Sequence, residues 1–485
     1  MNYDVVIIGS GFGSLTAAAL LAKRGLKVGV LEQAKYPGGC SSSFKRKGYW
    51  FETGATTLVG LDEHMPLRYL LDEIEVEVPV LKLEPSMQVH LPNGETLTRY
   101  GNLEDWIAEA ERVFGKDNQR PFWEHCYKIS QQVWRTSLQQ RSFPFSNIKD
   151  MLLSAARARP AQLKLLPGAF RTMEDMLRHY KLLQHKLFVD FVNEQLLITA
   201  QNNLEEVNEL FGATALCYTL YSNYYVPGGL INLVKPIVSY ISEQGSEVLY
   251  GHLVQRVSKE KDGYTTTTSK SSFKSRFVIS GIPLNNTQKL FEDDKVGKKL
   301  QKYVMPSKML NGAFTMGLVL QGQHAPEILH HQVHVPKGLP IIESKSIFIS
   351  FSHPEDRQRA PNGEVVASIS THVQHPEQKR IEDKAVIEAA ILDALVARGL
   401  IRREDIIYNQ SATPGAWVFW TGRAYGAVGG YPQYNRVKPW QMKDARLDHS
   451  GAYLCGDTVY PGQGIVGVCL SGIVVAGKLV QDHAV

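Results

Sequence analysis

Cysteine is scarce in this chain, and its placement excludes several classes of protein. The 485 residues contain five cysteines, and no two of them form a C-x-x-C pair, so neither a zinc site nor a disulfide framework is indicated. An odd number of widely spaced thiols is typical of a protein from a reducing compartment. The five are Cys40, Cys126, Cys217, Cys455 and Cys469.

Blocks of a single charge are also missing. The chain carries 53 Lys and Arg residues against 48 Asp and Glu residues, and its formal net charge is +5. The charges are dispersed, without a basic run of the kind that binds nucleic acid. We therefore expect no nucleic-acid partner and only a modest attraction to an anionic membrane.

A clean transmembrane segment is not evident. The longest apolar run, residues 464–480, contains Ser471, Lys478 and several glycines. It falls short of the roughly 20 apolar residues that span a bilayer, so we expect a buried helix there. Because residues 3–8 already have the pattern of a strand, we expect no signal peptide before the fold. A cytoplasmic location is the resulting expectation.

What the sequence does contain begins at once, with a β-α-β unit. Residues 3–8 (YDVVII) are mostly apolar and β-branched, as in a strand buried on both faces. Residues 9–13 predict a tight turn, residues 15–24 a helix and residues 27–32 a second strand. Because a unit of about 30 residues in this order is typical of dinucleotide-binding folds, we predict an α/β protein with a Rossmann-like domain.

The turn carries an incomplete glycine motif. Gly9 permits the sharp bend, and Gly11 lets backbone N–H groups approach a pyrophosphate at the helix N-terminus. Ser14 replaces the third glycine of G-x-G-x-x-G, and it is small enough for the close helix–strand packing that this position needs. Glu32 ends the second strand, at the distance expected for a residue that binds a ribose hydroxyl. We therefore predict a nucleotide site, in which Glu32 disfavours a 2′-phosphate.

Two further glycine-rich segments indicate which nucleotide is bound. Gly38 and Gly39 follow the strand that ends at Glu32. They form either an ordinary turn or a stretch of backbone that passes close to a pyrophosphate and a flavin. Near the other end, YLCGDTVYPGQGIVGVCLSG predicts a strand, a loop and a helix that starts at about Ile465. Asp457 is suited to bind a ribityl hydroxyl, and the helix N-terminus to hold the negative charge of a reduced flavin. Together these segments favour FAD.

The middle of the chain is mixed. Residues 44–60 predict a hairpin and a loop, and residues 382–398 predict a helix. Residues 146–220 are expected to be mainly helical and apolar, either as a membrane contact or as a helical cap whose basic side chains reach the solvent. The basic residues among its leucines are Arg157, Arg159, Lys164 and Arg171.

The whole chain resembles the flavin-dependent family of carotenoid (phytoene) desaturases, carotenoid cis–trans isomerases and retinol saturases. The pieces that carry the resemblance are GSGFGSLTAAALLAKRGLKVGVLEQ, PGGCSSSFKRKGYWFETGATTLVG, YYVPGGLINLV with GHLVQRV, and CGDTVYPGQGIVGVCLSG. The resemblance implies an FAD-binding domain assembled from residues 1–75, 224–290 and 441–485. An inserted α+β substrate domain would comprise residues 76–223 and 291–440, with 146–220 as its helical, possible membrane-contact region.

The resemblance also implies the cofactor-binding residues, with Val254 matching the residue whose backbone meets the adenine. Many relatives have Arg directly after the double glycine, where this chain has Cys40, and its Cys-Ser-Ser sequence is nearer the isomerase and saturase branches. The full set is Gly9, Ser10, Gly11, Phe12, Gly13, Ser14, Glu32, Gln33, Gly38, Gly39, Cys40, Ser41, Val254, Gly456, Asp457, Gly464, Ile465, Val466 and Gly467.

No catalytic side chain stands out, because no triad or metal cluster is evident. Arg423 and Glu194 are weak candidates, so the flavin itself is expected to carry the chemistry. The three histidines His330, His331 and His334 are expected to lie in a partly exposed strand or loop rather than in a metal site. A set of aromatic residues either lines an apolar tunnel or packs in the core: Trp417, Phe419, Trp420, Tyr425 and Tyr431.

The main hypothesis is an FAD-dependent oxidoreductase that desaturates a long apolar isoprenoid, such as a carotenoid, by hydride transfer from carbon to flavin N5. The alternatives are a cis–trans isomerase that uses reduced FAD and a retinol or carotenoid saturase. More distant alternatives are an amine oxidase and an FAD-free escort of prenylated proteins. No second nucleotide motif is present for NAD, so oxygen or a membrane quinone is the expected electron acceptor. Peripheral attachment to a membrane is expected.

Overall fold

The first of two large sheets is the frame of the nucleotide site. The computed structural model describes residues 2–291, 295–322, 326–379 and 381–485. Within them, a seven-stranded sheet has the order β10-β11-β12-β1-β2-β9, with β18 also pairing with β12. Its strands are β1 (Asn2–Ile8), β2 (Val28–Glu32), β9 (Glu247–Tyr250), β10 (Val254–Glu260), β11 (Gly263–Thr268), β12 (Ser272–Ser280) and β18 (Ala452–Leu454).

Three distant stretches of the chain therefore share one sheet. The pairs β1·β2, β1·β12, β2·β9 and β12·β18 are parallel, and β10-β11-β12 form an antiparallel extension. Parallel strands covered on both faces need continuous apolar runs, and Val5, Val6 and Ile7 are fully buried. The carboxyl ends of β1, β2 and β12 lie at one edge of the sheet, where ligands bind in such folds.

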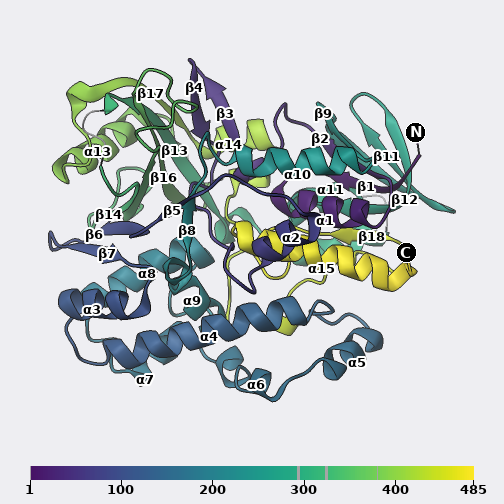
Figure 1. Ribbon diagram of the computed structural model, residues 1–485, viewed down its shortest axis with the longest axis horizontal. Helices are drawn as coiled ribbons and strands as arrows, with labels where there is room; N and C mark the ends of the chain where they lie inside the picture. The colour runs from purple at the N-terminus through teal and green to yellow at the C-terminus, as the bar shows by residue number, and fades with distance from the viewer. Residues whose placement is uncertain (1, 292–294, 323–325, 380) are drawn as a thin grey trace.

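Helices α1 (Phe12–Lys23), α2 (Pro66–Ile74), α10 (Ile231–Glu243) and α15 (Ile465–His483) pack with this sheet in one apolar core. The helix α1 begins at Phe12 with Gly11 as its N-cap, so the predicted turn over residues 9–13 is two residues too long. A Cβ on Gly472 would lie 2.4 Å from the carbonyl oxygen of Gly13. Glycine at these positions is what lets α1 and α15 lie side by side (Figure 1).

The helix α15 is long and apolar enough to cross a membrane, the one such helix among the described residues. However, 67% of its most apolar window is buried inside the structure. The buried helix expected for residues 464–480 is therefore confirmed.

The second seven-stranded sheet has the order β17-β13-β16-β15-β14-β6-β7. One of its faces forms a core with α13 (Lys384–Ala397), in which Phe314, Ile349 and Ile369 are buried. Its strands are β6 (Met87–His90), β7 (Thr96–Arg99), β13 (Asn311–Leu320), β14 (His330–His334), β15 (Ser346–Phe351), β16 (Val365–Gln374) and β17 (Ile406–Ala412).

A helical layer lies next to the second sheet and is built around buried aromatic rings such as Trp106, Trp123 and Phe188. Its helices are α3 (Leu103–Phe114), α4 (Gln119–Gln139), α7 (Met173–His179), α8 (Lys186–Ala200) and α9 (Glu209–Leu216). Asn102 caps α3 by accepting hydrogen bonds from the backbone of Glu104 and Asp105. The mainly helical character predicted for residues 146–220 is confirmed, and α5 (Ile148–Ala156) and α6 (Pro160–Leu163) lie at the rim, away from both sheets (Figure 1).

Two short pairings join the halves. The predicted hairpin β3 (Ser43–Arg46)–β4 (Tyr49–Glu52) places Phe51 against Val319 and Val366 of the second sheet. The pair β5 (Leu81–Leu83)–β8 (Asn223–Tyr225) is the other. The remaining helices are α11 (Leu284–Leu290), α12 (Lys295–Leu300) and α14 (Pro414–Thr421).

Candidate cofactor and substrate site

One large cavity joins the two halves of the molecule. Its volume is about 1750 Å³, and its lining includes Gly9 of the nucleotide loop, Asp457 near the C-terminus and His372 of the second sheet. Ligand pockets are usually between roughly 300 and 1,000 Å³. The cavity therefore has room for a cofactor and a second large ligand together.

The nucleotide loop has the conformation that only glycine adopts freely. Gly9 has φ +82°, and Gly11 precedes the first turn of α1, whose free N–H groups face the cavity. The double glycine lies against this loop, because the N–H of Gly38 donates to the carbonyl of Ser10 at 2.9 Å. A Cβ on Gly39 would lie 3.4 Å from the Cα of Gly11. The two glycine motifs thus form one cradle of bare backbone.

Ser14, the departure from the glycine motif, is accommodated by a glycine on β12's side of the loop. A Cβ on Gly281 would lie 1.7 Å from Oγ of Ser14 and 3.1 Å from the carbonyl oxygen of Ile8. Ser14 is 1% exposed. The helix and the strand can approach closely because the residue that faces Ser14, Gly281, has no side chain.

Glu32 closes the adenosine side of the loop. Its carboxylate accepts hydrogen bonds from the N–H of Ser10 (2.7 Å), the hydroxyl of Ser10 (2.6 Å) and the N–H of Ala34 (2.7 Å). Its carbonyl oxygen accepts from the N–H of His252 at 2.8 Å. Gln33 and Val254 line the same end of the cavity. The acidic side chain is held rigidly where a ribose is expected.

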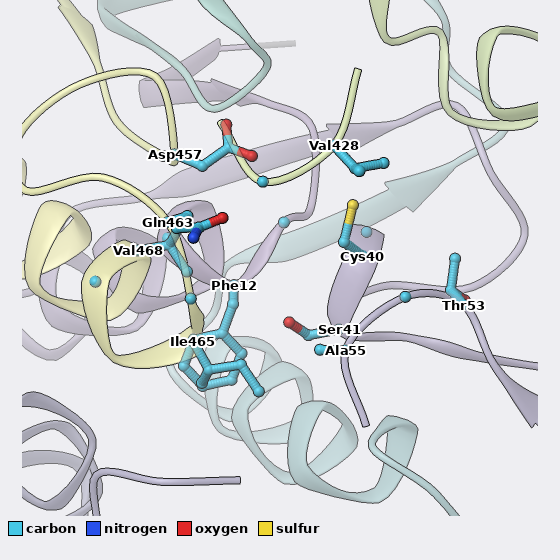
Figure 2. Close-up of a pocket in the computed structure, with 18 of the residues that line it drawn as sticks. Phe12, Cys40, Ser41, Thr53, Ala55, Val428, Asp457, Gln463, Ile465 and Val468 are labelled. Carbon is cyan, nitrogen blue, oxygen red and sulfur yellow. The ribbon is translucent and has the colours of Figure 1, made fainter. Parts of the chain in front are cut away.

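The other end of the cradle comes from the C-terminal segment. Gly464, with φ +82°, is the N-cap of α15, so the N-terminus of a second helix faces the cavity. Within it, a Cβ on Gly467 would lie 2.9 Å from the carbonyl oxygen of Gly462. Figure 2 shows Phe12 and Ile465, from the first turns of α1 and α15, on one side of the pocket, and Cys40 and Val428 on the other. Ser41, Gly456 and Val466 complete the lining there.

Arg423 joins this end of the cavity by an ion pair. Its guanidinium donates to the carboxylate of Asp457 at 2.7 Å and to the carbonyl of Ala427 at 2.6 Å. Burial raises the pKa of the Cys40 thiol, and the neighbouring Arg423 charge opposes that rise. The guanidinium that lies beside Cys40 thus comes from a segment far along the chain.

Glu194 lies outside the cavity lining. It accepts a hydrogen bond from the hydroxyl of Ser346 at 2.6 Å, and burial raises the pKa of its carboxyl. Of the predicted aromatic set, Trp417, Phe419 and Trp420 line the cavity, with Trp417 buried and the other two largely exposed. Tyr425 and Tyr431 do not line it.

The three histidines lie in a strand, β14, which was one of the two expected alternatives, but the partial exposure expected there is wrong. His330, His331 and His334 are all buried, because β14 is paired on both sides, with β15 and β6. Burial lowers the pKa of His330 to about 3 and those of His331 and His334 to about 4. Nε2 of His331 lies 2.7 Å from the carbonyl oxygen of Ile328, and its Nδ1 lies 3.2 Å from Nε2 of another imidazole, His90. Among the described residues, no group of three His, Cys, Asp or Glu side chains is placed to hold a metal.

The far half of the cavity has two unlike walls. The helical wall is apolar and includes Ile198, Leu210 and Phe211, with Leu165 and Leu166 next to the molecular surface. The wall made by the second sheet is partly polar. Its polar strip consists of Thr315, Ser368, Ser370 and His372, beside apolar lining residues such as Ala313 and Phe348. The sequence interpretation missed this strip. The alternation in VVASISTHVQ is the signal that would have found three of its residues.

A nucleotide cradle at the carboxyl edge of a parallel sheet, opening into a substrate cavity, defines a dinucleotide-dependent oxidoreductase. The bare backbone at Gly9 and Gly39 and the two helix N-termini fit a pyrophosphate and a flavin. The chain belongs to the family described as flavin containing amine oxidoreductase, whose model matches residues 15–480. It is therefore an FAD-dependent enzyme.

The named relatives are of several kinds. Prolycopene isomerase of Daucus carota is 22% identical over 99% of this chain and 80% of its own length. The neurosporene-forming phytoene desaturase of Rhodobacter capsulatus is 22% identical over 98% and 94%. An all-trans-retinol 13,14-reductase of Danio rerio is 46% identical over 59% and 48%.

Solved structures show the same fold at low identity. An oxidoreductase from Methanosarcina mazei has a TM-score of 0.63 at 17% identity, over 99% of this chain and 100% of the other. A fatty acid isomerase from P. acnes that produces CLA has a TM-score of 0.59 at 14% identity, over 100% and 99%.

Proposed function

We propose that the enzyme desaturates a long apolar isoprenoid, such as a carotenoid. The observation that carries this function is the single cavity of about 1750 Å³ that connects the nucleotide cradle to an apolar helical wall. The resemblance to phytoene desaturases over nearly the whole chain supports it. The same division of the chain would make residues 1–75, 224–290 and 441–485 the FAD-binding domain, and the rest the substrate domain.

In this proposal, the predicted cofactor residues hold FAD from its two ends. Glu32 would bind the ribose and the backbone of Val254 the adenine, and the N-terminus of α1 the pyrophosphate. Asp457, oriented by its 2.7 Å bond from Arg423, would bind the ribityl chain. The N-terminus of α15 would favour negative charge on the ring.

The chain's own part in the chemistry is positioning and exclusion of water. When bound, FAD supplies a hydride acceptor and passes the electrons to oxygen or a membrane quinone. The apolar helical wall would hold a polyene in line with the flavin end of the cavity and keep water out. A conjugated chain spreads developing positive charge, which is consistent with a site that lacks an evident acid–base pair.

We also propose that the enzyme takes its substrate directly from a membrane surface. Large apolar side chains are exposed on α5, α6 and the loop after them: Ile148 (75%), Met151 (57%), Leu152 (66%), Leu163 (65%) and Phe170 (59%). The adjoining Leu166, also exposed, lines the cavity. Exposed Arg157, Arg159 and Lys164 stand among them, the combination of apolar and basic residues that favours an anionic bilayer.

The test is turnover by purified holoenzyme on carotenoids in liposomes, with an added electron acceptor. The absorption spectrum and the mass of the product are measured together. A loss of two hydrogens supports desaturation. If neither the absorption nor the double-bond geometry of any carotenoid changes, the proposal is abandoned.

Isomerisation with reduced FAD is the second candidate, because the prolycopene isomerases match 99% of the chain. The same assay separates the reactions. A product of unchanged mass with altered geometry indicates an isomerase, and a gain of two hydrogens indicates a saturase.

A further inference from the structure

The sheet wall of the cavity carries an ordered polar strip where a hydrocarbon substrate would need none. Ser368, Ser370 and His372 alternate along β16, so their side chains share one face of the sheet. Each of the three is partly exposed and lines the cavity, whereas the alternate residues Ala367, Ile369 and Val373 are buried in the core with α13. Thr315 of β13 pairs directly with Ser370.

The hydroxyls of this strip are left without partners. In the described part of the chain, no hydrogen bond is formed by the hydroxyl of Thr315 or of Ser370, and Oγ of Ser368 is buried without a partner. A hydrocarbon packed over them would exclude water and give no hydrogen bond in return. Such unsatisfied groups cost the full desolvation penalty, so the strip selects against an all-hydrocarbon contact.

His372 is held in one tautomer by its neighbour. The Nε2 group of Gln201 donates to the carbonyls of Leu197 (3.2 Å) and Ile198 (3.4 Å), which fixes it as the amide nitrogen. The amide nitrogen carries two hydrogens, and the two carbonyls share one of them. The other is left for Nε2 of His372, 3.2 Å away, which accepts it. Burial lowers the pKa of His372 to about 4, so the ring is neutral and its proton is on Nδ1. The described residues offer no partner to that N–H.

This donor lies at the flavin end of the strip. Gln463, in the loop before α15, donates to the carbonyl of Ile198 at 2.9 Å, and Ile198 is also bonded to Gln201. On the strand side, His372 pairs with Ala313, and the carbonyl of Asn311, two residues before Ala313, accepts a hydrogen bond from the N–H of Val428 at 2.9 Å. Figure 2 places Gln463 and Val428 on opposite sides of the pocket.

We infer that the polar strip is a binding subsite for oxygen on the substrate. The substrate is then an isoprenoid with a hydroxyl or carbonyl group, whose oxygen accepts from Nδ1 of His372 and bonds to the hydroxyls of Thr315 and Ser370. The inference rests on the proposed function and narrows its substrate class from carotenes to oxygenated isoprenoids. It also orients the chain, since the oxygenated end lies against the sheet and the apolar body against the helices.

The test compares matched ligands on the FAD-loaded enzyme. All-trans-retinol is titrated against the same hydrocarbon without its hydroxyl, and a monohydroxylated carotene against its parent carotene. The perturbation of the flavin absorption gives each dissociation constant. Three hydrogen bonds to the ligand, each contributing about several-fold in affinity, predict a preference for the alcohol of tenfold or more.

Variants assign the preference to the strip. Thr315→Val and Ser370→Ala should each reduce the ratio of the hydrocarbon dissociation constant to the alcohol dissociation constant several-fold. The double variant should leave only the several-fold preference that the N–H of His372 gives. Thr214→Val is the matched control, because its hydroxyl also lies at the cavity but already donates to the carbonyl of Leu210 at 2.7 Å. This control should keep the wild-type ratio.

Three results would overturn the inference. Equal affinity of wild-type enzyme for alcohol and hydrocarbon removes it while leaving the proposed function in place. A preference for the alcohol that the Thr315 and Ser370 variants do not change also removes the inference, since the oxygen is then bound elsewhere. If no isoprenoid of either kind perturbs the flavin, the proposed function fails and the subsite fails with it.

Discussion

The contact between Ser14 and Gly281 gives the sharpest test of the nucleotide loop. Gly281→Ala would place a methyl group 1.7 Å from Oγ of Ser14 and 3.1 Å from the carbonyl of Ile8. The serine hydroxyl can rotate, but its own Cβ also lies 3.1 Å from the new methyl group. The backbone at the start of α1 must therefore shift.

The magnitude follows from the packing. Inserting a methyl group into a filled core costs about 1–3 kcal/mol, and we expect Gly281→Ala to fall in that range. Ser14→Gly alone should cost no more than about 0.5–1 kcal/mol, which is the cost of a glycine in a helix, because the buried hydroxyl that it removes has only the weakly bonding thiol of Cys455 beside it. The double variant restores the spacing, so we expect a favourable coupling of about 1 kcal/mol or more.

The assay is equilibrium urea unfolding of the four proteins in a double-mutant cycle, with the dissociation constant for FAD measured on each. For a chain this long, melting temperature is a poor measure, since 1 kcal/mol shifts it by only about 1 °C. Gly477→Ala is the control, because a Cβ at that helical position meets nothing within 4 Å. It should be neutral or slightly stabilising.

Additive effects in the cycle would refute the reasoning. If Ser14→Gly does not rescue Gly281→Ala, the two residues are not complementary surfaces of one contact. The tolerance of serine in the glycine motif would then need another cause.

Three other perturbations have definite outcomes. Arg423→Met leaves the carboxylate of Asp457 without its partner and should weaken FAD binding about tenfold, measured by flavin fluorescence, while Arg423→Lys should lose less. Burial and the neighbouring His90 lower the pKa of His331 to about 4. Because the unfolded chain therefore binds a proton at a higher pH than the folded protein does, the free energy of unfolding should fall as the pH drops from about 6.5 towards 4. His331→Gln should reduce the slope of unfolding free energy against pH by up to about 1.4 kcal/mol per pH unit. Leu152→Asp with Leu163→Asp should abolish sedimentation with anionic vesicles and leave the FAD content unchanged, and retained sedimentation would contradict the membrane contact.

The parts of this structure that the sequence predicts are those set by local chemistry. The unit at residues 3–32 follows from a β-branched run, two glycines and an alanine-rich helix, and the helix predicted for residues 382–398 begins after Asp383, whose side chain accepts from the N–H of Ala385 at 2.9 Å. These signals need no knowledge of the rest of the chain.

The features that the sequence interpretation got wrong or missed are not set by local chemistry, because each depends on a residue far along the chain. The burial of His331 comes from β6, whose His90 lies 241 positions earlier. The ion pair that orients Asp457 comes from Arg423, in a segment without a motif.

The polar strip is visible in the sequence, but its role depends on the structure around it. The alternation of Ser368, Ser370 and His372 is visible in the sequence, and by itself it predicts only a strand with one polar face. Such a face is normally turned to solvent. In this molecule a helical layer lies next to the sheet, and the polar face lines the cavity between them. A ligand that fills the cavity has to offer each hydroxyl a partner. The same pattern that marks a surface strand in isolation therefore marks a specificity site here, and the difference lies wholly in what the second layer encloses.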